Sequence, residues 1–85
     1  MNSKVTSILI LLVFFSFPLK ADLAESLLKN GNREYTEKNY TAAAEEYRKI
    51  ISMGVHNSTV YYNLGNALYR SGELGRALLA YEKAF

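Results

Sequence analysis

The sequence repeats itself once at a spacing of 34 residues, and this repeat restricts the fold more than any other feature. The identical pairs include Gly31 and Gly65, Asn32 and Asn66, Ala43 and Ala77, and Tyr47 and Tyr81. A period of roughly 20 to 50 residues marks chains built from stacked structural units. Apolar residues in each copy recur every three or four positions, which is typical of amphipathic helices. We therefore predict an all-α fold of two stacked antiparallel helical hairpins, at residues 22–57 and 58–85.

The second copy combines small and large apolar residues in a way that suits close helix packing. Gly65 and Ala77 are small where two helices of a hairpin must approach each other. Large side chains are expected to fill the space that remains; they are Tyr61, Leu64, Leu68, Leu78 and Tyr81.

Turn and capping residues set the expected helix bounds. Gly72 accepts a left-handed backbone and should end the third helix. Lys38, one repeat earlier, should cost about 1 kcal/mol in that conformation unless Asn39 adopts it instead. The residues expected at helix starts are Asp22, Asn57 or Ser58, and Glu73. These signals predict helices over residues 23–37, 40–52, 58–70 and 74–85.

The second copy resembles the tetratricopeptide repeat at every signature position: Tyr61, Leu64, Gly65, Leu68, Gly72, Ala77, Tyr81 and Ala84. The first copy fits less well, because Asn30, Glu34 and Lys38 stand where leucine, a large apolar residue and glycine are usual. The resemblance implies an α-solenoid fragment that works as a protein-interaction scaffold or adaptor, and not as an enzyme.

In this family the first helix of each hairpin lines a concave groove that binds a peptide or partner protein. Carried over position by position, the groove should hold these residues: Leu28, Asn32, Tyr35, Thr36, Thr59, Tyr62, Asn63, Asn66, Tyr69 and Arg70. Asparagine amides can pair with both backbone groups of a peptide, while tyrosine and arginine add contact area and charge-assisted bonds. In the alternative interpretation, Tyr62 and Tyr69 only pack against neighbouring repeats.

The first 21 residues have the order of a secretory signal peptide. A short basic start, Met1–Lys4, precedes an apolar run, Val5–Phe17, and a small residue, Ala21, after which we expect cleavage. The apolar run is shorter than the roughly 20 residues that span a bilayer. An uncleaved membrane anchor is the alternative, because Leu19 is large for its position before the cut. Export to the periplasm or cell envelope is therefore predicted.

Composition argues against most other functions. The chain has no cysteine, and its one histidine, His56, is expected to be a solvated turn residue, so we expect no metal site and no catalytic group. No glycine pattern suits a nucleotide cofactor. Beyond Ala21 the basic and acidic residues balance without forming a basic cluster, which argues against nucleic-acid binding.

A narrower resemblance covers the run YYNLGNALYRSGELGRALLAYEKA at residues 61–84. Together with the leader, this run looks like the tetratricopeptide component of bacterial aerotolerance-operon (Bat) proteins, which implies a membrane-associated envelope complex as partner. Such proteins usually continue further, so a fragment of a longer protein is expected. Two hairpins cannot cover every apolar residue near the end of the chain, namely Leu74, Leu78, Leu79 and Phe85. Self-association through uncapped repeat ends is therefore the alternative function.

Overall fold

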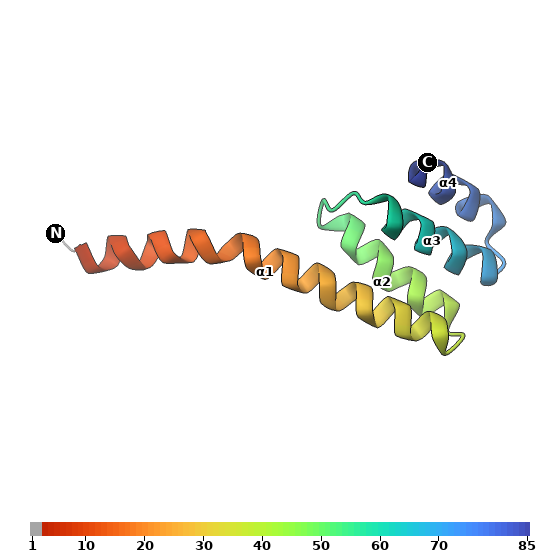
Figure 1. The fold of residues 1–85 in the computed structure, drawn as a ribbon, viewed down its shortest axis with the longest axis horizontal. Coiled ribbons are helices and arrows are strands. Elements are labelled where there is room, and N and C mark those ends of the chain that lie inside the picture. The colour runs from red at the N-terminus through yellow and green to blue at the C-terminus, as the bar shows by residue number, and fades with distance from the viewer. Residues whose placement is uncertain (1–2) are drawn as a thin grey trace.

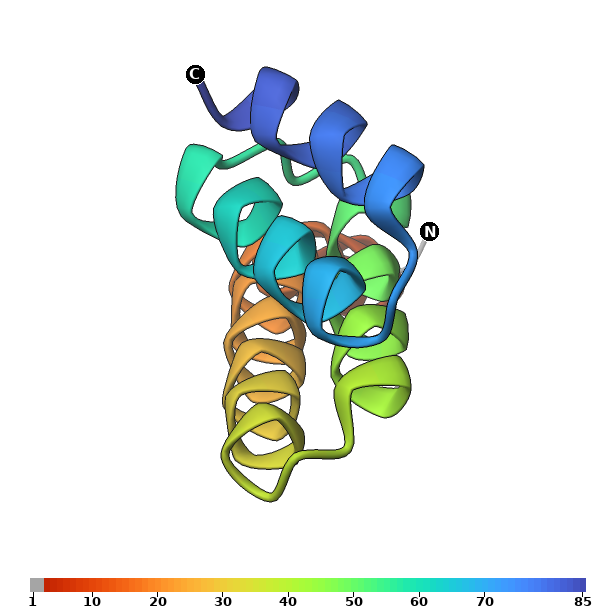
Figure 2. The same cartoon turned by 90° about the vertical axis from the view of Figure 1, so that its right-hand side faces the viewer.

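The computed structural model describes the backbone of residues 3–85 and the side chains of residues 19–85. Its helices are α1 (Ser3–Thr36), α2 (Tyr40–Ser52), α3 (Ser58–Arg70) and α4 (Leu74–Ala84), and residues 3–85 contain no strand. The main contacts join each helix to the next in the chain, so α1 and α2 form one hairpin and α3 and α4 a second (Figure 1). Viewed end on, the second hairpin crosses the first at an angle (Figure 2). The predicted all-α fold of stacked hairpins is confirmed.

The predicted start of the first helix was wrong. Instead of beginning near Leu23, α1 runs from Ser3, so Asp22 lies inside a helix and caps nothing. Residues 19–25 are mostly good helix formers without glycine or proline, so nothing there ends the helix. The signal peptide stays a prediction, because the side chains of residues 1–18 lie outside the described part. In the part that is described, no helix has the length and apolar character that a membrane span requires.

The core lies where α2, α3 and α4 meet. Its largest fully buried side chains are Tyr47, Ile50 and Leu68, and alanines fill the closest contacts between helices. The other buried apolar residues are Ala43, Ala44, Val60, Tyr61, Leu64, Ala67, Ala77 and Ala80. Leu27 and Leu28 of α1 pack against this cluster from one side.

Leu78 does not belong to the core, contrary to the sequence prediction. Its side chain is 60% exposed, whereas Ala44, one repeat earlier, is 1% exposed. The difference arises because α3 covers Ala44, while no described residue covers the same face of α4. The sequence also predicted that two hairpins could not cover all of Leu74, Leu78, Leu79 and Phe85, and all four are exposed.

The glycine and tyrosine that recur in both copies touch each other in both hairpins. A Cβ atom built on Gly31 would lie 2.6 Å from Tyr47 Cε1, and one on Gly65 would lie 2.6 Å from Tyr81 Cδ1. Carbon atoms cannot approach so closely, so any larger residue would push the tyrosine ring away. The two glycines therefore set the separation of the helices within each hairpin.

Both hairpin turns use the same backbone geometry although their sequences differ. Lys38 and Gly72 have φ of 66° and 89°, so the lysine, and not Asn39, adopts the left-handed conformation. In each turn the next residue's N–H donates back to a carbonyl five positions earlier, Asn39 to Glu34 at 2.8 Å and Glu73 to Leu68 at 2.9 Å.

Of the predicted helix caps after α1, only Asn57 caps with its side chain. Its Oδ1 accepts hydrogen bonds from the backbone N–H groups of Thr59 at 2.8 Å and Val60 at 3.4 Å. Glu73 occupies the position before α4, but its carboxylate makes no capping bond to the backbone.

Candidate partner-binding groove

A hollow of about 210 Å³ lies where α1, α2 and α3 meet. Its lining is mainly polar and uncharged, and consists of Asn32, Tyr35, Thr36, Tyr47, Asn63 and Asn66. Five of the ten residues predicted for the groove are brought together here: Asn32, Tyr35, Thr36, Asn63 and Asn66. The first helices of both hairpins contribute to it, as the position-by-position transfer predicted.

Two asparagines of this hollow are held by tyrosines from the second helix of their own hairpin. The hydroxyl of Tyr47 donates to Asn32 Oδ1 at 2.7 Å, and that of Tyr81 donates to Asn66 Oδ1 at 2.6 Å. Because each amide oxygen is engaged in this way, each amide NH₂ group stays available to donate to a ligand. The repeat therefore reproduces a positioned hydrogen-bond donor once per hairpin.

The tyrosine hydroxyls that hold these amides stay protonated at physiological pH. Burial raises the pKa of Tyr47 from 10.0 to about 12, with a further contribution from Tyr35. Burial also raises the pKa of Tyr81. Both hydroxyls therefore remain donors over the whole physiological pH range, and the orientation of the amides does not depend on pH there.

Asn63 differs from the other two asparagines of the hollow, because no tyrosine hydroxyl bonds to its amide in the described part of the chain. Its side chain is half-buried, and among the residues that the structure describes it makes no hydrogen bond within the chain. An amide in this position can offer both a donor and an acceptor to the backbone of a bound segment.

Arg70, another predicted residue, does not line this hollow. Its guanidinium carbon is 6.0 Å from the ring centre of Tyr40, and that ring meets Tyr35 edge to face at 5.2 Å between ring centres. Arg70 thus joins the start of α2 to the end of α3, and it contacts the hollow only through Tyr40 and Tyr35.

Thr59, Tyr62 and Tyr69 lie on a different surface. Leu28, also predicted for the groove, packs against the core instead. Thr59 and Tyr62 line a hollow of about 200 Å³ with Phe85, and the ring of Tyr62 is 6.2 Å from that of Phe85. Tyr69 lines a hollow of about 230 Å³ along α4. The predicted groove is therefore divided into an asparagine-lined part and an aromatic part beside α4.

The sequence prediction overlooked Tyr47 and Tyr81 as residues of the site. The repeat itself could have indicated them, because a glycine, an asparagine and a tyrosine recur together in both copies at the 34-residue spacing. The glycine leaves room for the tyrosine ring, and the asparagine directly after the glycine then lies next to the tyrosine hydroxyl.

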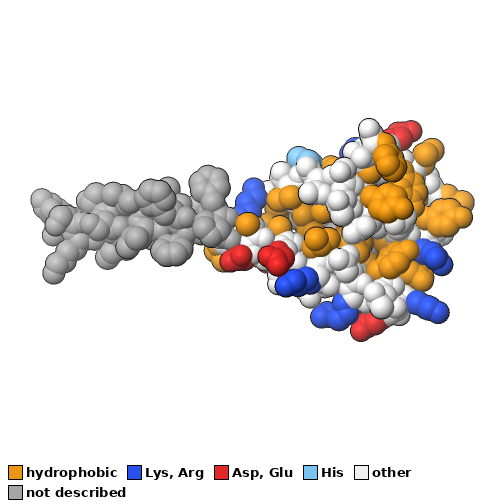
Figure 3. Space-filling model, viewed as in Figure 1, with side chains coloured by type: hydrophobic (Ala, Val, Ile, Leu, Met, Phe, Trp, Pro, Cys, Tyr) orange, Lys and Arg blue, Asp and Glu red, His pale blue; other side chains and the backbone are white. Residues whose placement is uncertain are grey.

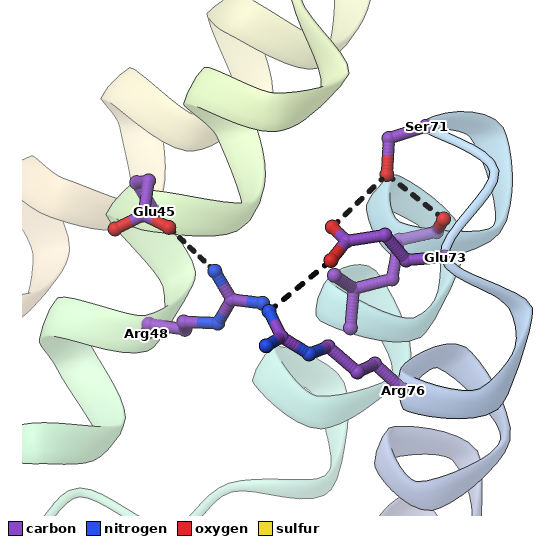
Figure 4. A network of polar contacts seen from close by, with 6 residues as sticks. Glu45, Arg48, Ser71, Glu73 and Arg76 are labelled. Atoms are coloured by element: carbon purple, nitrogen blue, oxygen red, sulfur yellow. Dashed lines mark hydrogen bonds and ion pairs between the residues drawn. The ribbon is translucent and has the colours of Figure 1, made fainter.

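Surface ion pairs lie within α2 and at the start of α4, each between residues three positions apart in the chain. Arg48 pairs with Glu45, and Arg76 with Glu73 at 3.1 Å, while Ser71 Oγ lies 3.5 Å from Glu73 (Figure 4). These groups are exposed or half-exposed, so each pair contributes only tenths of a kcal/mol. They act as ordinary surface ion pairs.

His56 is exposed, as predicted, but it also has a partner. Its Nδ1 lies 2.9 Å from the hydroxyl of Tyr61, and the two rings stack. Across the described residues, no three His, Cys, Asp or Glu side chains lie close enough to hold a metal ion.

The comparison with protein families decides what the second hairpin is. Residues 58–85 match the family described as Tetratricopeptide repeat. The second hairpin is a tetratricopeptide repeat. This repeat begins with the first residue of α3 and includes all of α4. Tetratricopeptide repeats are generally non-catalytic modules of protein–protein interaction, which agrees with the function expected from sequence. No curated protein and no solved structure shows significant similarity to the chain.

Proposed function

We propose that this chain is a scaffold or adaptor that binds an extended segment of a partner protein in the hollow lined by Asn32, Asn63 and Asn66. The observation that carries the proposal is the pair of equivalent Tyr–Asn hydrogen bonds, at 2.7 and 2.6 Å, which aim one amide donor per hairpin at the same hollow. Donors fixed before binding lose little freedom when a ligand arrives. An extended peptide has unpaired backbone carbonyl and N–H groups that such amides can satisfy.

The lining favours a peptide over other ligands. It contains no charged side chain, which argues against a strongly charged ligand such as a nucleotide or nucleic acid. Tyr35 supplies an aromatic surface against which an apolar side chain of the bound segment can pack.

We further propose that the protein acts in the cell envelope, within a membrane-associated complex of the Bat type. The support is the order of residues in the first 21 positions and the resemblance of residues 61–84. N-terminal sequencing of protein recovered from envelope fractions should find Asp22 as the first residue. An intact Met1 in a soluble cytoplasmic pool would overturn export.

A photo-crosslinking amino acid placed in the full chain tests the groove directly. At position 63 it should form covalent adducts with a partner protein, and mass spectrometry of the adduct identifies the bound segment. Position 49 is the matched control, because Lys49 is exposed on α2 and does not line the hollow. Equal adducts at both positions would contradict a specific groove.

The segment identified in this way then allows a quantitative test. Asn63→Ala should weaken the synthetic peptide about fivefold in fluorescence anisotropy, which corresponds to the roughly 1 kcal/mol of one hydrogen bond. The melting temperature should not change, because the side chain of Asn63 makes no hydrogen bond to the described part of the chain. Unchanged affinity in Asn63→Ala would place the peptide elsewhere.

A further inference from the structure

A larger hollow, of about 480 Å³, lies between the two hairpins and shares no lining residue with the asparagine-lined hollow. One wall comes from α2, the other from α4, and α3 supplies most of the floor. The floor is apolar and consists of Tyr61, Leu64, Leu68 and Ala80, while Leu79, 59% exposed, stands at its edge. Because the walls and the floor belong to both hairpins, the described residues form this hollow by themselves.

Three basic side chains border this hollow, and no described acidic residue does. They are Arg48 of α2, and Arg76 and Lys83 of α4, and we call the space the basic hollow. On the face shown in Figure 3, by contrast, the Lys and Arg side chains are spread around the periphery among hydrophobic and uncharged ones. Charges of one sign beside an apolar floor concentrate the electric field inside a hollow, so the basic hollow attracts anions.

The guanidinium groups of Arg48 and Arg76 point toward each other although they come from different helices (Figure 4). Each pairs through Nη1 with a glutamate three positions earlier, Arg48 with Glu45 and Arg76 with Glu73. These exposed pairs are weak, and neither glutamate lines the hollow. The other N–H groups of both guanidiniums make no hydrogen bond to the described residues, so they can bind a second anion. An anion between the two arginines would also relieve their mutual repulsion.

Lys83 places a third charge at the other end of the α4 wall. Its ammonium nitrogen is 5.7 Å from the ring centre of Tyr61, and this contact holds the charge over the apolar floor. Lys83 forms no ion pair with the described residues. Seven positions separate Lys83 from Arg76, which corresponds to about 10 Å along the helix axis. The basic hollow therefore presents cations at both ends of an apolar surface.

We propose that the basic hollow binds an extended segment of a partner protein in which two acidic side chains flank an apolar one. Alternate residues of an extended segment lie on one face, so an acidic, an apolar and an acidic residue at every second position would all face the hollow. The two outer residues are then about 13 Å apart along the backbone, and the flexible arginine, lysine and glutamate side chains close the difference from the spacing on α4. The apolar residue meets Leu79 and the floor.

This spacing favours a peptide over an anionic lipid, because one phosphate headgroup cannot reach both ends of the hollow. The site is independent of the proposed function. The asparagine-lined hollow offers amides to a peptide backbone, whereas the basic hollow selects acidic side chains.

A titration of the ¹⁵N-labelled full chain with the blocked peptide Glu-Ser-Leu-Ser-Glu tests the site by nuclear magnetic resonance. The side-chain N–H signals of Arg48 and Arg76 and the backbone signal of Leu79 should shift and reach saturation. The neutral peptide Gln-Ser-Leu-Ser-Gln should bind at least fivefold more weakly, and Lys-Ser-Leu-Ser-Lys should cause no saturable shift. Raising the salt from about 0.1 M to 1 M, which shortens the screening length from about 10 Å to 3 Å, should weaken the acidic peptide several-fold.

Two arginine variants provide a matched comparison, because the side chains of Arg76 and Arg33 are 65% and 62% exposed and each lies near a glutamate. Arg76→Gln should weaken the acidic peptide about threefold, whereas Arg33→Gln should leave its affinity unchanged, since Arg33 does not line the hollow. Leu79→Ser should weaken it by a similar factor through loss of the apolar contact. Helical circular dichroism should be kept in all three variants, because these side chains are exposed.

Several results would overturn the proposal. They are the absence of saturation at millimolar peptide, equal affinity for the glutamine peptide, and equal weakening by Arg33→Gln and Arg76→Gln. Binding of phosphatidylglycerol vesicles without binding of the acidic peptide would assign the basic hollow to a membrane surface instead. Asn63→Ala should not change the affinity for the acidic peptide, so the two hollows succeed or fail independently. Weakening by Asn63→Ala would place this peptide in the asparagine-lined hollow.

Discussion

The two hairpins share one internal framework but differ in what surrounds it. In each, a glycine admits a tyrosine ring, and that tyrosine holds an asparagine at the same hollow. The second helix of the first hairpin is covered by α3, whereas the second helix of the second hairpin exposes Leu74 and Leu78. The shared glycine, asparagine and tyrosine therefore serve packing within each hairpin, whereas Ala44 and Leu78 differ in whether a neighbouring helix covers them.

Gly65→Leu should produce the largest effect on this shared framework. The added side chain would displace the Tyr81 ring, since even a Cβ would lie 2.6 Å from it, and we expect a loss of about 3 kcal/mol of stability. Thermal unfolding followed by circular dichroism measures it. Gly31→Leu should cause a comparable loss if the hairpins are equivalent.

Gly75→Ala is the control for this experiment. A Cβ at Gly75 has no neighbour within 4 Å among the described residues, so the substitution should be neutral or slightly stabilising. If Gly65→Leu melts like the original chain, the glycine–tyrosine contact does not set the helix separation.

Alkaline pH should weaken the first hairpin through Tyr47. Its pKa is about 12 when folded and 10.0 when exposed, so the folded state holds the proton more tightly. Stability is unaffected below pH 10 and falls as the pH rises, by about 2 kcal/mol at pH 12. Urea unfolding at several pH values should show a shallower decline in Tyr47→Phe than in the original chain. Identical declines would mean that Tyr47 does not contribute to the alkaline loss.

Asn57→Ala should cost about 1 kcal/mol, because it removes the side-chain acceptor for two backbone N–H groups at the start of α3. Glu73→Ala, at the same position before α4, should cost only tenths, since Glu73 makes no capping bond. The pair of melting curves compares the helix starts of the second hairpin. Equal losses would show that the Asn57 bonds add nothing.

The smallest expected effect is a gain in the first turn. Lys38 has φ of 66°, so Lys38→Gly should relieve strain and stabilise the chain by less than about 1 kcal/mol. Gly72→Lys should have the opposite effect in the second turn. A destabilised Lys38→Gly would mean that the lysine side chain makes a compensating contact.

Much of this fold could be predicted because local signals and the repeat agree. Asn57 caps α3, Gly72 ends it, and the predicted bounds of α2 and α3 match the structure. The start of α1 was missed because Asp22 is a favoured capping residue, yet residues 19–25 contain no glycine or proline that would end the helix before it. Leu78 was misplaced because its spacing is that of a core residue, and spacing cannot tell whether a neighbouring helix is present to cover it.

The groove was predicted in part for a similar reason. Asn32, Asn63 and Asn66 face one hollow, as the repeat positions indicated. Tyr62 and Tyr69 lie beside α4 of their own hairpin, and the spacing along α3 does not show which of its residues α4 contacts.

The bond between tyrosine hydroxyl and asparagine amide couples helix packing to amide orientation within each hairpin. A change at Gly31 that moved the Tyr47 ring would also release Asn32, so these three residues act as one unit. A hairpin transplanted into another helical array would carry its oriented donor with it. Each hairpin added to such an array would therefore add one oriented amide donor.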